Sequence, residues 1–108
     1  MIKTKYIPQP NADLILKLLN LIKKKLPHGY IKVIDSIEGD VIYEGNEPEK
    51  ALEEMDGIDA DFGVNCYIYD NCCGWFFLTP YEEEGCVLCN YSDNSFCMEI
   101  AENLTTII

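Results

Sequence analysis

Cysteines in the C-terminal half are spaced in a way that could hold a zinc ion. Cys72 and Cys73 form one pair, Cys86 and Cys89 form a second pair after twelve intervening residues, and Cys97 follows. Tetrahedral zinc sites commonly take two ligands from each of two short segments. These segments are poor clips, because adjacent cysteines would need opposed side chains and Cys86 and Cys89 point to opposite faces of an extended strand. We predict no metal site and expect small, buried apolar residues.

The segment Cys86-Val-Leu-Cys89 could also be a redox pair, and His28, the only histidine, could be a general base. A redox pair lowers its thiol pKa at a helix N-terminus, whereas this segment is predicted to be a strand flanked by acids. His28 lies in a Pro-His-Gly turn, where a capping or solvated role is typical. The chain has no glycine-rich phosphate loop and no arginine to clamp an anion. We therefore expect no enzyme and no cofactor.

Charge is distributed very unevenly along the chain. Residues 1–32 contain seven of the eight lysines and one acid, for a net charge of +6, whereas residues 33–108 contain 18 acids and one base, Lys50, for −17. A strongly acidic surface repels nucleic acid and anionic membranes. The expected partner is therefore a basic protein surface, for which a carboxylate array can imitate nucleic-acid phosphates.

We predict that two acidic groups and one tyrosine contact this partner. The aspartates of the first group resemble a calcium loop only superficially, because no register supplies ligands at positions 1, 3 and 5 with Gly at 6 and Glu at 12. Tyrosine is a rigid, half-polar side chain that often dominates the energetics of interfaces. The predicted contact residues are Glu53, Glu54, Asp56, Asp59 and Asp61, then Tyr81, Glu82, Glu83 and Glu84.

The N-terminal segment has no apolar stretch typical of a signal peptide. Residues 14–26 are apolar on one side only and carry four lysines, which argues against a membrane span. We expect a cytoplasmic protein with reduced thiols. Abundant Ile, Asn and Lys with no Arg are typical of an AT-rich coding sequence, as in a low-GC bacterium, virus or mobile element.

The first half of the chain predicts two helices and a hairpin. Residues 11–26 have an apolar stripe at helical spacing, with Asn11 as N-cap and lysines in the last turn. Residues 30–36 and 41–44 alternate like strands around a Glu-Gly-Asp turn. Residues 47–56 follow as a short helix, with Asn46 as N-cap, Pro48 in the first turn and Glu49 in a capping box.

The second half predicts three strands and a helix. Residues 62–69 alternate, 70–74 form a turn, and 75–79 are apolar on both faces, which indicates a central strand. A loop over 80–85 leads to a strand at 86–91. After Ser92, residues 97–104 have helical spacing, although Phe96, Met98 and Ile100 would also suit a strand.

The expected architecture is a single α+β domain over residues 1–108 with the element order α-β-β-α-β-β-β-α. The sheet would have about five strands, mostly antiparallel, with the helices packed on one face. The leading functional hypothesis is a small acidic protein that binds and blocks a basic nuclease or other nucleic-acid-handling protein. It could be a phage or mobile-element inhibitor of a defence nuclease, or an immunity protein against a toxin. The alternative is a structural or zinc-stabilised interaction module.

Overall fold

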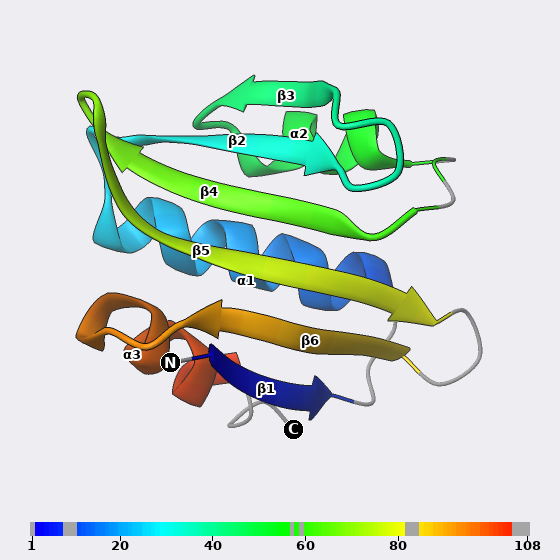
Figure 1. The fold of residues 1–108 in the computed structure, drawn as a ribbon. Coiled ribbons are helices and arrows are strands. Elements are labelled where there is room, and N and C mark those ends of the chain that lie inside the picture. Colours follow the sequence, from blue (N-terminus) through cyan, green and yellow to red (C-terminus); the bar gives the residue numbers. More distant parts are fainter. Residues whose placement is uncertain (1, 8–10, 57, 59, 82–84, 105–108) are drawn as a thin grey trace.

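Six strands form one antiparallel sheet, and three helices pack against one of its faces (Figure 1). This computed structural model describes residues 2–7, 11–56, 58, 60–81 and 85–104; for 2–7, 11–13, 80–81 and 85–89 it describes the backbone alone. The predicted α+β class and the order α-β-β-α-β-β-β-α are confirmed. A strand that the sequence analysis did not predict, β1 (Ile2–Ile7), precedes them and pairs with β6 (Gly85–Ser92).

The sheet has the order β1-β6-β5-β4-β2-β3. Its centre is β4 (Phe62–Ile68) and the long β5 (Asn71–Tyr81), and its second edge is β3 (Val41–Gly45), which pairs with β2 (Tyr30–Asp35). The turn predicted at 70–74 is shorter than expected, since Ile68 already pairs with Asn71. The loop predicted at 80–85 is also shorter, because Tyr81 pairs with Gly85.

The helical layer is built around α1 (Asn11–Lys25), which confirms the first predicted helix. Its apolar stripe is fully buried against the sheet, while Lys23 and Lys24 are exposed. α2 (Pro48–Met55) packs on α1 and β3, and α3 (Ser95–Leu104) packs on α1, β5 and β6. The core is this interface between helices and sheet. At its edge, an ion pair of 2.6 Å joins Lys25 of α1 to Glu99 of α3.

The predicted cap of α2 is wrong. Glu47 occupies the N-cap position in extended conformation and makes no side-chain cap hydrogen bond. Asn46 instead donates from Nδ2 to the carbonyl oxygen of Leu26 at 3.3 Å, so its side chain ties the β3–α2 connection to the end of α1. Pro48 begins the helix as predicted, because a missing N–H costs nothing in the first turn.

The C-terminal segment is a helix rather than a strand. Asn94 accepts a hydrogen bond from the backbone N–H of Cys97 at 2.9 Å and so caps α3. Cys97, Ile100 and Leu104 are buried on one side of it, which is the helical spacing. Cys97 lies against Gly74, where an added Cβ would overlap its Sγ, so this glycine lets α3 approach β5 closely.

Candidate interaction surface

The structure separates the residues predicted to contact a partner. Glu53, Glu54 and Asp56 are exposed on or just after α2, in the helical layer beside the β3 edge. Tyr81 ends β5, and two other strands, β4 and β2, lie between β5 and β3. Asp61 directly precedes β4 and is near the same end of the sheet as Tyr81, since Phe62 pairs with Leu78. Asp59, Glu82, Glu83 and Glu84 lie outside the described residues, as does the side chain of Tyr81.

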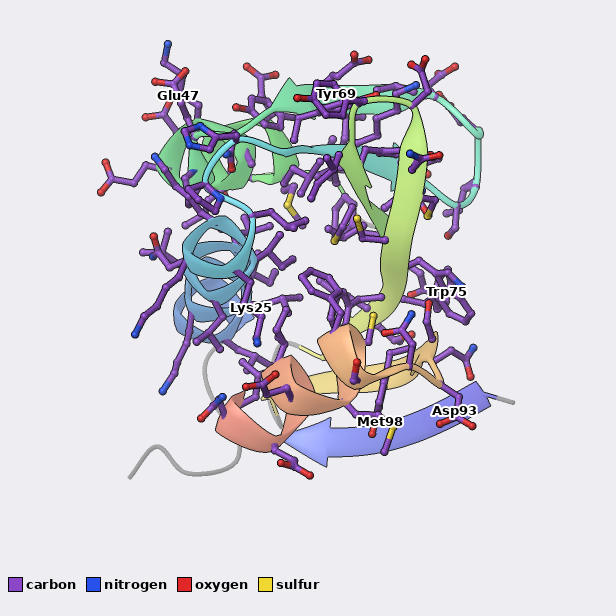
Figure 2. The ribbon with its side chains drawn as sticks, turned by 90° about the vertical axis from the view of Figure 1, so that its left-hand side faces the viewer. Lys25, Glu47, Tyr69, Trp75, Asp93 and Met98 are labelled. Carbon is purple, nitrogen blue, oxygen red and sulfur yellow. The ribbon has the colours of Figure 1, made fainter. Side chains whose placement is uncertain are left out.

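No described element covers the other face of the sheet, which we call the outer face. In Figure 2 the helices lie on one side of the strands, whereas Trp75 points to the opposite side. Strand register assigns the described side chains of this face by alternation from the buried Val64 and Phe76. They are Tyr30, Lys32, Ile34, Val41, Glu44, Asn65, Tyr67, Trp75, Phe77, Thr79 and Asn90, with Gly63 among them.

Aromatic and aliphatic side chains dominate the centre of the outer face. The rings of Tyr30 and Tyr67 stack with centroids 5.2 Å apart, and Lys32 Nζ lies 5.4 Å from the centre of the Tyr67 ring. Trp75 and Phe77 are only partly exposed, although nothing described lies over them. The neighbouring side chains of the same face therefore cover part of each ring.

This surface was missed in the sequence analysis, although a signal for it was present. Residues 75–79 were predicted to be apolar on both faces, and all helices were predicted on one face. Together these two expectations leave one apolar face of β5 without a covering layer. Trp75 and Phe77 lie on this uncovered face, while Phe76 and Leu78 point into the core.

The tyrosines that lie near the acids in the sequence occupy different environments in the structure. Tyr91 is buried, with its ring stacked on Phe76 at a centroid distance of 6.3 Å, so it belongs to the core. Tyr67 lies on the outer face. Tyr69 is 84% exposed at the tip of the β4–β5 hairpin and has a φ angle of 54°, a left-handed conformation that is unfavourable for a bulky residue.

We expect Tyr69→Gly to raise the free energy of unfolding by about 0.5–1 kcal/mol. Relief of about 1–2 kcal/mol of left-handed strain outweighs the extra chain entropy of glycine, and an exposed ring contributes few contacts. Urea unfolding measures the change. Tyr69→Ala is the matched control, because it removes the ring but keeps a Cβ at positive φ. Equal stability of the two variants would show that the backbone at this turn is not strained.

The described cysteines do not behave as one group. Cys97 is buried as expected, and Cys66 is buried too, whereas Cys72 is exposed and Cys73 partly exposed, so the prediction of burial is wrong for Cys72. Burial, with the neighbouring Cys97 as a smaller cause, raises the pKa of Cys66 well above its ordinary value. Its thiol is therefore protonated at neutral pH, which does not suit a nucleophile or metal ligand.

The register of β5 and β6 separates the cysteine pairs proposed as zinc clips. Cys86 pairs with Pro80, which is eight residues along β5 from Cys72, a separation of about 26 Å at strand spacing. Cys72 and Cys86 therefore cannot bind the same ion. Among the described residues, no group of three or more His, Cys, Asp or Glu side chains is arranged to hold a metal.

His28 is exposed in the turn between α1 and β2. The three described helices contain 15, 8 and 10 residues, and none of them has the length and apolar character needed to cross a membrane.

The outer face and the acidic residues around it are the surface features of the described chain with the clearest potential to bind another molecule. Comparison of this chain with protein-family models, curated proteins and solved structures gave no match.

Proposed function

We propose that this protein acts by binding: its acidic surface associates with a basic nucleic-acid-handling protein, such as a nuclease, and blocks it. The observation that carries the proposal is the net charge of −17 on residues 33–108. Lys50 is the only base in that stretch, and its Nζ lies 3.3 Å from Glu47. A field of this sign attracts a basic protein over several ångströms and accelerates its association.

The exposure of the acids supports this proposal. Acidic side chains are exposed on α2, on β3 and at both ends of the sheet, in elements far apart in the sequence. They include Glu38, Asp40, Glu44, Glu49, Glu53, Glu54, Asp56, Asp70 and Asp93. The basic residues Lys23 and Lys24 lie together in the last turn of α1, where they offset the helix dipole.

The proposed setting is the cytosol of a low-GC bacterium, where the protein would be a phage or mobile-element inhibitor of a defence nuclease or an immunity protein against a toxin nuclease. The free thiols of Cys66, Cys72, Cys73 and Cys97 would stay reduced there. No catalytic step is part of this role.

Affinity capture from a low-GC bacterial lysate tests the proposal. The tagged protein is expected to retain a basic nucleic-acid-binding protein that rising salt or competing DNA releases. With the purified partner, the triple change Glu53→Gln, Glu54→Gln, Asp56→Asn should lower the association rate several-fold at low salt and leave dissociation nearly unchanged, because exposed charges steer encounter.

The matched control is the double change Lys23→Gln, Lys24→Gln, which makes the protein more acidic and should not slow association. An association rate that neither the acid substitutions nor added salt alters would contradict an electrostatically driven role. Retention of acidic proteins alone would contradict it as well.

A further inference from the structure

Gly63 has no evident role within the chain. It is the second residue of β4, where glycine costs strand stability because it has no side chain to pack and a large chain entropy. A Cβ added at Gly63 would meet no atom within 4 Å. The φ angle of Gly63 lies outside the left-handed region that favours glycine.

Gly29 and Gly74 provide the contrast. A Cβ at Gly29 would lie 2.5 Å from the carbonyl oxygen of Tyr67, and a Cβ at Gly74 would overlap Cys97. Packing within the chain therefore explains why these two positions have no side chain. It does not explain Gly63, and a glycine within a strand often marks a place where another molecule approaches closely.

The neighbours of Gly63 form an apolar row across the outer face. Gly63 pairs with Ile34 on β2 and with Phe77 on β5, and Ile34 pairs with Val41 on β3. The missing side chain therefore leaves a notch between Ile34 and Phe77. Trp75 lies two residues from Phe77 on the same face, and Trp is among the residues that most often dominate binding energy.

Acidic residues surround this apolar centre. The exposed Glu38 and Asp40 lie in the turn after β2, Asp70 in the turn after β4, and Asp93 after β6, while Asp61 precedes β4. Among the residues of this face whose side chains are described, Lys32 is the only cation, and it pairs in register with Glu44.

We propose that the basic partner docks on the outer face, inserting an apolar side chain at the Gly63 notch beside Phe77 and Trp75. The partner would surround that side chain with Lys or Arg residues facing the acidic rim, which is the usual arrangement of an apolar interface core within a polar border. This inference rests on the proposed function and deepens it. It assigns the contact to the outer face, whereas Glu53 and Glu54 of α2 act through their long-range field.

Gly63→Lys tests this assignment. The change adds bulk and one positive charge at a position where an added Cβ meets no atom within 4 Å, so the fold should persist. Gly63→Val adds bulk without charge and uses a residue that favours strands. Glu49→Gln is the matched control, since it changes the net charge by the same amount as Gly63→Lys but lies on α2.

The probe is a panel of purified basic nucleases and basic DNA-binding proteins, titrated at low salt. Trp75 is the only tryptophan, so its quenching by acrylamide reports directly on coverage of the outer face. For a panel member that binds, we expect protection of Trp75 and a loss of affinity of about 100-fold with Gly63→Lys and Gly63→Val. Glu49→Gln should change affinity by about threefold or less. Circular dichroism and urea unfolding check that each variant is folded.

The remaining outcomes separate the inference from the proposed function. If wild type and all three variants bind equally and Trp75 stays open to quenching, the partner docks elsewhere and the inference is wrong, while the inhibitory role stands. If wild type binds no basic protein of the panel, the proposed function is contradicted and the inference falls with it.

Discussion

Phe76→Ala is expected to lower the free energy of unfolding by about 3–5 kcal/mol, the usual cost of removing a buried aromatic ring. Phe76 is fully buried at the centre of β5, stacks on Tyr91 and faces the helices. Its removal leaves a cavity between the two layers that rigid neighbours fill only in part. Urea or thermal unfolding measures the effect.

Phe77→Ala is the matched control for this substitution, because it makes the same chemical change one residue further along the same strand. Phe77 points to the outer face and is partly exposed, so its truncation should cost about 1 kcal/mol of stability. It should also weaken partner binding, whereas Phe76→Ala should weaken binding only as far as it unfolds the protein. Similar stability losses for the two variants would show that the outer face is covered in solution.

Gly29→Ala is expected to lower the free energy of unfolding by about 1–3 kcal/mol through overpacking. The added Cβ would lie 2.5 Å from the carbonyl oxygen of Tyr67 and 3.0 Å from Cβ of Leu26. A backbone oxygen cannot rotate away as a flexible side chain can. Relief therefore requires movement of β4 against the end of α1, which disturbs a hydrogen-bonded strand.

Gly63→Ala is the control for Gly29→Ala, since the same methyl group enters open space. We expect unchanged stability or a gain of about 0.5 kcal/mol, because alanine loses less chain entropy than glycine on folding. Unfolding of both variants under the same conditions makes the comparison. Equal destabilisation would mean that the backbone conformation at each position, not contact with the added methyl group, determines the cost.

The sequence determined the elements whose pattern is local. The stripe from Leu14 to Leu26 specifies α1 because it repeats at helical spacing over several turns, and the alternation of residues 62–68 specifies β4. Helices and strands of this kind follow from which side of a segment is apolar. The acidic character of residues 33–108 is likewise a property of composition. These features supported the α+β class and the expectation of a basic partner.

Predictions from local sequence pattern were wrong where contacts between distant parts of the chain determine the structure. β1 forms by pairing with β6, which lies more than 75 residues further along the chain. The residues around β1 do not indicate such a distant partner strand. Asn46 does not cap α2, because the helix begins at Pro48 and Glu47 occupies its N-cap position; the Asn46 amide instead donates to the carbonyl oxygen of Leu26, 20 residues earlier in the chain. The two cysteine pairs are close in the sequence, but the register of β5 and β6 places Cys86 opposite Pro80, far along β5 from Cys72.

The candidate interaction surface depended most on tertiary structure. The sequence identified the acids as a charge but could not show which of them share a face, because that depends on strand order. It contained Gly63, Trp75 and Phe77 as ordinary strand residues. The packing of all three described helices on one side of the sheet leaves these residues without a covering layer among the described elements, and an apolar face of this kind is a candidate binding surface.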